Sequence, residues 1–94
     1  MPIKYEWDPG KARVNFRKHG ITFTDASTVF ADILAITVRD PDHSDDEERW
    51  VTLGYSARQR LLVVVYTEEE ETIRLISART ADRLERRKYE EGDS

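Results

Sequence analysis

The fold of this chain is decided by the stretch LLVVVYTEEEETIRLIS, residues 61–77. Its first part, residues 61–67, is a continuous apolar run with three consecutive valines, which predicts a central β-strand covered on both faces. The four glutamates at 68–71 cannot be buried together, so they predict the tip of a hairpin. Residues 73–77 predict the returning strand, in which Arg74 points to the face opposite its two apolar neighbours.

Two more strands are predicted upstream of this hairpin. Residues 33–38, ILAITV, are rich in β-branched side chains and predict one strand, which ends at Pro41 because proline cannot donate to a sheet. Residues 49–55 predict the other strand, and a turn at 56–59 leads into the central strand. Successive strands joined by short turns predict an antiparallel meander.

The N-terminal third predicts one further strand and two helices. Residues 3–7 alternate between apolar and polar side chains, as in a half-buried strand. A helix should follow, with Asp8 as its N-cap and Pro9 in its first turn, and end at Gly20. A short second helix is predicted for residues 24–32.

The C-terminal segment predicts one more helix and completes the fold class. Thr80 should cap a helix from residue 81 to about residue 91, anchored by Leu84 and Tyr89. A chain of 94 residues supports one hydrophobic core. We therefore expect a single α+β domain over residues 1–94, with a meander of four to five strands, two N-terminal helices and one C-terminal helix.

The composition excludes several kinds of site. With no cysteine, the chain has no disulfide, no thiolate redox pair and no cysteine-based zinc site. It contains no phosphate-binding or dinucleotide-binding glycine motif, so no cofactor is expected. Its longest apolar run, residues 61–65, is far shorter than the roughly 20 residues that span a bilayer, and its first residues lack the apolar stretch of a signal peptide. A cytoplasmic protein without a membrane partner is expected.

The net charge of −4 conceals a segmental pattern. Residues 1–20 carry five Lys and Arg against two acids, and residues 74–88 carry six against two. The acids concentrate at 40–48 and at 68–71. An acidic balance argues against a nucleic-acid partner. Two basic ends that meet in the fold would nevertheless form a basic face.

The first group of potentially reactive side chains lies in the acidic segment between the two upstream strands. His43 can titrate near neutral pH, Glu48 can act as a general base, and Arg49 can stabilise charge on a phosphoryl group. The alternative is a solvated acidic loop. A metal site is a weaker interpretation, because the carboxylates lack the spacing and the glycine of a calcium loop. No metal is expected.

The second group consists of arginines near the last strand. Arg74 lies within a mostly apolar strand and Arg79 lies shortly before a helix, so each is suited either to pair with a carboxylate or to hold an anionic ligand. Arg60, before the central strand, would complete a clamp on a phosphodiester.

Other cations have simpler explanations. Lys18 and His19 in the last turn of the first helix stabilise the helix dipole, with RNA contact as the alternative. Arg83, Arg86 and Arg87 in the last helix fit an exposed surface, with RNA contact as the alternative for Arg86.

Three segments in order carry a resemblance: KHG at 18–20, HSDDEER at 43–49 and IRLISAR at 73–79. YEWD at 5–8 precedes them, and Glu85-Arg86 follows. Each segment is weak alone, but together and in this order they are specific, and they cover nearly the whole chain. The sequence resembles the BrnT toxin family.

The resemblance implies a RelE-like fold and a ribonuclease toxin of a type II toxin–antitoxin pair, which inhibits translation and growth. It also implies a small BrnA-like antitoxin that binds in equal numbers and alone contacts operator DNA. We expect a metal-independent endoribonuclease that activates the ribose 2′-OH of RNA. The candidate catalytic residues are His43 or Glu48 as the base, Arg74 and Arg79 as charge stabilisers, and Arg49 in support. The candidate RNA-binding residues are Lys18, His19, Arg60 and Arg86.

A hypothesis of a different class stays open. The chain would then be a catalytically inert toxin-fold module in a DNA-binding autoregulatory complex. It is favoured by the net charge and by the glutamates at 68–71, which stand where the family often places an arginine.

Overall fold

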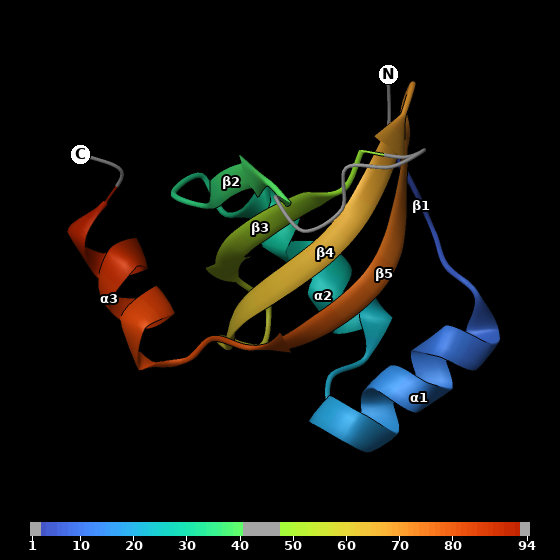
Figure 1. Cartoon of the computed structure of the whole chain (residues 1–94), viewed down its shortest axis with the longest axis horizontal. Coiled ribbons are helices and arrows are strands. Elements are labelled where there is room, and N and C mark those ends of the chain that lie inside the picture. Colours follow the sequence, from blue (N-terminus) through green and yellow to red (C-terminus); the bar gives the residue numbers. More distant parts are fainter. Residues whose placement is uncertain (1–2, 41–47, 93–94) are drawn as a thin grey trace.

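The computed structural model describes residues 3–40 and 48–92 as one five-stranded sheet with helices on both of its faces (Figure 1). The strands are β1 (Lys4–Glu6), β2 (Ile36–Arg39), β3 (Trp50–Tyr55), β4 (Leu61–Glu69) and β5 (Thr72–Thr80), in the order β1-β5-β4-β3-β2. The helices are α1 (Pro9–His19), α2 (Phe23–Ser27), the 3₁₀ turn η1 (Thr28–Ala31) and α3 (Arg83–Glu91). Within the described part, no helix is long and apolar enough to cross a membrane.

The sheet is mixed, which corrects the prediction of a purely antiparallel meander. Strands β2 to β5 form that meander, each antiparallel to the next. β1, however, pairs in parallel with β5, with Tyr5 opposite Ile73 and Glu6 opposite Arg74. The alternation of residues 3–7 predicts a strand, but it carries no information about a partner so distant in sequence.

Local capping chemistry positions α1 as predicted. The Asp8 carboxylate accepts a hydrogen bond from the backbone N–H of Lys11 at 2.9 Å, and Pro9 opens the helix. Gly20 ends it with φ of 73°, a left-handed conformation that residues with a side chain rarely adopt.

Two predicted boundaries on the way to β3 differ from the structure. α2 begins after Thr22 rather than at Thr24, because the Thr22 hydroxyl accepts a hydrogen bond from the backbone N–H of Asp25. β2 begins only at Ile36, because the Asp32 carboxylate accepts a hydrogen bond from the backbone N–H two residues later and holds the preceding segment in a turn.

The main core lies on the face of the sheet that α2 and η1 cover, behind β4 and β5 in Figure 1, and α1 lies beside β5 with Ala12 against this core. Trp7 and Phe23 meet edge-on with ring centroids 5.8 Å apart, and Phe30 meets Tyr66 in the same way at 4.9 Å. The buried residues of this core are Ile21, Phe23, Ala26, Val29, Leu62, Val64, Tyr66, Ile73, Leu75 and Ala78.

The opposite face has a smaller core beneath α3. Leu53, Leu61 and Val63 are buried there, and Tyr89 packs against them. The prediction that Leu84 also anchors this helix is wrong, because its side chain is 73% exposed. The helix begins after Asp82, two residues later than predicted, because Asp82 and Glu85 form a capping box there.

A buried asparagine ties α1 to β5. The Asn15 side-chain amide donates to the carbonyl oxygen of Ala78 at 2.9 Å and to that of Ile21 at 3.1 Å. Its oxygen accepts a hydrogen bond from the backbone N–H of Ala78 at 3.0 Å. β1 pairs with β5 only as far as Arg74. Asn15 therefore does for Ala78 what a neighbouring strand would do, and it fixes the helix beside the sheet.

Candidate functional site

Arg74 and Arg79 project from the same face of β5 because the strand contains a bulge. Two residues five positions apart normally point to opposite faces. In the β4–β5 ladder, however, Val65 pairs with Ser77, and the next residue of β4, Tyr66, pairs with Leu75. Ile76 is therefore left without a partner in β4. The extra residue shifts the alternation of side chains along β5 by one position. As a result, both arginines lie on the face of the sheet opposite the main core.

Arg79 is held by the start of α3. Its guanidinium donates to both carboxylate oxygens of Glu85, each at 2.8 Å. Glu85 also accepts a hydrogen bond from the backbone N–H of Asp82 and completes the capping box of the helix. The hydrogen bond from Arg79 lowers the pKa of Glu85, and the same hydrogen bond raises the pKa of Arg79. The pair is half-exposed, so the guanidinium is oriented without being sealed from solvent.

Arg74 has a weaker partner. It donates to the Glu6 carboxylate at 3.2 Å, and both side chains are about half exposed. An exposed ion pair of this kind contributes about 0–1 kcal/mol to stability. Its guanidinium can therefore exchange the carboxylate for another anion at little cost.

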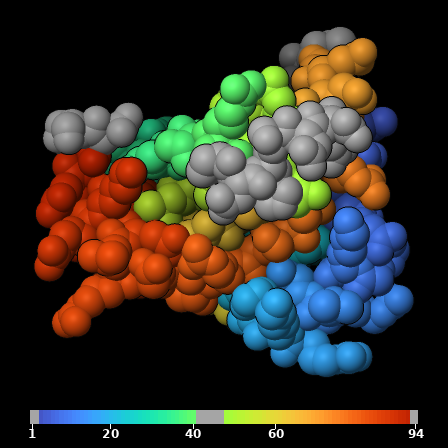
Figure 2. Space-filling view, in the orientation of Figure 1, coloured from blue at the N-terminus to red at the C-terminus, as the bar shows by residue number. Residues whose placement is uncertain are grey.

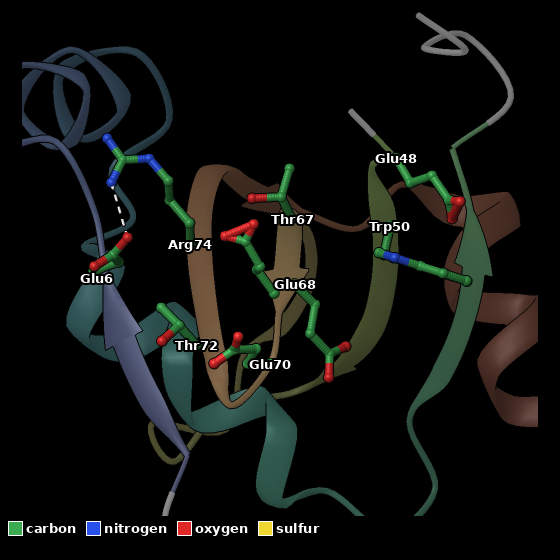
Figure 3. Close-up of a pocket in the computed structure, with 9 residues that line it drawn as sticks. Glu6, Glu48, Trp50, Thr67, Glu68, Glu70, Thr72 and Arg74 are labelled. Atoms are coloured by element: carbon green, nitrogen blue, oxygen red, sulfur yellow. Dashed lines mark hydrogen bonds and ion pairs between the residues drawn. The ribbon is translucent and has the colours of Figure 1, made fainter. Parts of the chain in front are cut away.

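A broad hollow of about 970 Å³ surrounds the end of the β4–β5 hairpin. Figure 3 shows Arg74 and Glu6 on one side of it, Glu48 and Trp50 on the other, and Glu68 between them. Five glutamates and one arginine line this hollow. It therefore repels a phosphodiester more than it attracts one.

Glu48 is already engaged at the rim of that hollow. Its carboxylate accepts a hydrogen bond from Arg39 at 2.6 Å, and this contact lowers the pKa of Glu48. The Arg39 guanidinium also lies 5.9 Å from the centre of the Trp50 ring, at cation–π distance. A carboxylate with a lowered pKa is a weak base, which reduces its suitability for accepting a proton from a ribose hydroxyl.

Arg60 has a structural contact. Its guanidinium donates to the Asp25 carboxylate at 3.0 Å, and the same carboxylate oxygen accepts a hydrogen bond from Ser56 at 2.9 Å. The Asp25 side chain is only 4% exposed, whereas that of Arg60 is 34% exposed. The other Asp25 oxygen is buried and has no hydrogen-bond partner among the described residues. The arginine thus compensates a buried negative charge.

The remaining predicted residues lie in different places. Arg86 donates to the Tyr55 hydroxyl at 3.1 Å on the α3 side. Lys18 and His19 line a groove of about 480 Å³ with Ser77, beside β5. Arg49 is half-buried directly before β3. His43 lies outside the described residues.

The two basic ends of the chain do not merge into one surface. Figure 2 shows α1 in blue and α3 in red on either side of a surface to which β5, in orange, contributes. The end of β5 is tied to both basic helices, because Arg79 contacts Glu85 of α3 and the neighbouring Ala78 contacts Asn15 of α1. Among residues 3–40 and 48–92, no group of three or more acidic or histidine side chains could hold a metal ion.

Glu85 and Asn15 position other groups, and neither was predicted as a residue of the site. Glu85 had a readable signal, because Asp82 and Glu85 have the spacing of a capping box. Asn15 had none, since an asparagine within a helix does not reveal a partner 63 residues away.

Two comparisons relate the chain to known proteins. Residues 7–85 match a family described as "Ribonuclease toxin, BrnT, of type II toxin-antitoxin system". The crystal structure of the Brucella abortus ribonuclease toxin BrnT is similar, with a TM-score of 0.63 and 23% sequence identity over 86% of this chain and 99% of that one. No curated protein matches the sequence. The family match covers most of the chain, and the chain therefore belongs to the BrnT family of ribonuclease toxins of type II toxin–antitoxin systems.

Proposed function

We propose that this chain is an active, metal-independent endoribonuclease. Its catalytic surface would be the face of β5 opposite the main core, between α1 and α3. The observation that carries the proposal is the arrangement of Arg79. Its guanidinium is oriented by two hydrogen bonds to Glu85, remains partly exposed, and lies on the same face as Arg74. A cation fixed in this way can stabilise the charge that develops on a phosphate under attack.

The proposed reaction is attack of a ribose 2′-oxygen on the adjacent phosphorus. The 2′-O–P bond forms and the P–O5′ bond breaks, which leaves a 2′,3′-cyclic phosphate on one fragment and a 5′-hydroxyl on the other. A base must remove the 2′ proton and an acid must protonate the leaving oxygen. Arg79 would hold the non-bridging oxygens of the attacked phosphate. Arg74, five residues away on β5 and so about 16 Å distant, would hold another phosphate of the same RNA, with Arg49 in support.

Two residues remain proposed as the base. Glu48 is ionised at neutral pH, but its pairing with Arg39 lowers its pKa and weakens it in this role. His43 is proposed because an imidazole is the side chain best suited to accept a proton near neutral pH. Among the proposed RNA contacts, Lys18 and His19 lie beside β5 and Arg86 lies on α3, whereas Arg60 would contact RNA only with its exposed part.

Purified protein free of its partner should cleave RNA in the presence of EDTA. Arg79→Ala should lower the cleavage rate at least about a hundredfold, the order of loss expected when one donor to a developing oxyanion is removed. Arg87→Ala removes an exposed arginine of α3 and serves as the matched control. Full RNA cleavage by Arg79→Ala, or cleavage only when Mg²⁺ or Mn²⁺ is added, would refute this assignment.

The type II family implies an antitoxin partner. We propose that this partner is BrnA-like, binds the toxin in equal numbers and provides all contacts to operator DNA. Expression of the chain alone should then stop translation and growth in the cytoplasm, and co-expression of the partner should restore both.

The inert-module hypothesis keeps one observation in its favour. The hollow at the β4–β5 tip carries five glutamates, and such a surface suits a basic protein segment better than RNA. Under this hypothesis, cells that express the chain without its partner grow normally, and Arg79→Ala changes nothing.

A further inference from the structure

One side of α1 forms a groove with the start of α2 that has no role in the function proposed above. The groove has a volume of about 560 Å³. It is lined by Trp7, Ala12, Arg13, Phe16, Arg17, Thr22, Phe23 and Thr24. We refer to it as the α1 groove. Two arginines and three aromatic rings thus share one small surface that no acidic side chain lines.

Within the described structure, the cations of α1 lack the acidic partners that the arginines in and beside the sheet have. Arg39, Arg60, Arg74 and Arg79 each pair with a carboxylate. The four cations of α1 are Lys11, Arg13, Arg17 and Lys18, and none of them forms an ion pair with any residue of the described ranges. α1 itself contains no acid, and the Asp8 carboxylate before it is used as the N-cap. The helix therefore presents positive charge that the described part of the fold does not neutralise.

An aromatic side chain is exposed beside these cations. Phe16 is 54% exposed on the wall of the α1 groove, although a ring of this size is normally buried. Trp7 and the buried Phe23, in edge-on contact, form the apolar floor. A nucleobase can stack on such a ring, while arginines on the same helix turn reach the flanking phosphates.

From these observations we propose that the α1 groove binds single-stranded RNA, with a base on Phe16 and phosphates on Arg13 and Arg17. Asn15 holds α1 against Ala78, next to Arg79, whereas the α1 groove opens on the main-core side of the helix, where Trp7 and Phe23 line it. The inference rests on the proposed ribonuclease function and extends it, because it assigns RNA binding to a surface away from the reacting phosphate.

The test measures binding separately from cleavage. The probe is a short fluorescein-labelled oligouridine with 2′-O-methyl riboses, which lacks the attacking hydroxyl and stays intact. Affinity is measured by fluorescence polarisation over a range of salt concentrations, with the full chain and its variants. Thermal unfolding of each variant confirms that it is folded.

Phe16→Ala should weaken binding at least about fivefold without changing the salt dependence, because it removes stacking but no charge. Phe16→Trp keeps an aromatic ring and should restore the affinity. Arg13→Gln combined with Arg17→Gln removes two phosphate contacts and should reduce the slope of log affinity against log salt by about 1.4. The control is Arg83→Gln combined with Arg87→Gln, which removes the same charge from the exposed surface of α3.

Equal weakening by the α1 pair and by the α3 control would show that net charge alone attracts RNA, and would overturn the inference. Unchanged RNA affinity in Phe16→Ala would overturn it as well. If that variant then failed to bind the antitoxin, the groove would be a protein-binding site instead. The two proposals fail separately. If the unmutated protein binds the probe through the groove but cleaves no RNA, only the ribonuclease assignment is contradicted. If the unmutated protein cleaves RNA but Phe16→Ala binds the probe as tightly as it does, only the groove assignment is contradicted.

Discussion

Replacing Asn15 by alanine should destabilise the protein more than an alanine substitution at any other position of α1. The substitution removes three hydrogen bonds of 2.9 to 3.1 Å at a side chain that is 4% exposed. It leaves the N–H and C=O of Ala78 and the C=O of Ile21 without partners. Each lost bond costs about 1 kcal/mol net, so the free energy of unfolding should fall by about 3 kcal/mol.

A loss of this size is large compared with the total stability of about 5–15 kcal/mol that is typical of folded domains. For a domain of this length it corresponds to a decrease in Tm of about 12–24 °C. Urea unfolding followed by the fluorescence of Trp7 and Trp50 measures the change, and an unaltered m-value shows that it reflects stability rather than a different unfolded state.

Two further variants test the reason for this loss. Asn15→Asp is nearly isosteric and can accept the Ala78 N–H, but its carboxylate cannot donate to the two carbonyl oxygens, so it should be at least as destabilising as Asn15→Ala. Val14→Ala alters the neighbouring exposed position and should change stability by less than about 0.5 kcal/mol. A cost below about 1 kcal/mol for Asn15→Ala, or an Asn15→Asp variant as stable as the parent, would refute the argument.

Three other predictions follow from contacts described above. Arg60→Ala leaves the buried Asp25 carboxylate without its ion-pair partner and should lower the free energy of unfolding in urea by about 3 kcal/mol. Adding Asp25→Asn to this variant should recover part of the loss. Burial and the hydrogen bond to Asp32 raise the pKa of Tyr89 to about 12 from an ordinary value of 10.0, so the folded state binds this proton more tightly and stability should decline as pH rises from 10 to 12. Tyr89→Phe should abolish that decline, and persistence of the decline in unfolding titrations would contradict the assignment. Gly20→Ala should cost about 1–2 kcal/mol through its φ of 73° alone, because no atom lies within 4 Å of an added Cβ, and Gly20→Asn should cost less when both are measured by thermal unfolding.

Elements whose ends depend on local chemistry could be predicted from the sequence. α1 is the clearest case, because Asp8, Pro9 and Gly20 each act on their own neighbours. The start of α3 was predicted wrongly for a related reason. Thr80 and Asp82 are both possible N-caps, and Glu85 decides between them by completing a capping box with Asp82.

Features that depend on distant contacts could not be predicted. The parallel pairing of β1 with β5 joins the two ends of the chain, and hydrophobic periodicity carries no information about such a partner. The bulge at Ile76 also has no signal in the sequence, yet it determines that Arg74 and Arg79 lie on the same face of β5. The partners of these arginines, Glu6 and Glu85, became known only from the fold.

The position of β5 inside the sheet has a consequence for synthesis on the ribosome. β5 lies between β1 and β4, and Asn15 of α1 needs Ala78 of the same strand. A chain that leaves the ribosome from its N-terminus therefore carries β1 and α1 for most of translation without the strand that holds them. Such long-range closure also slows folding. We expect the nascent chain to lack both the proposed catalytic face and the α1 groove until β5 has emerged, which delays any RNA cleavage until that strand is made.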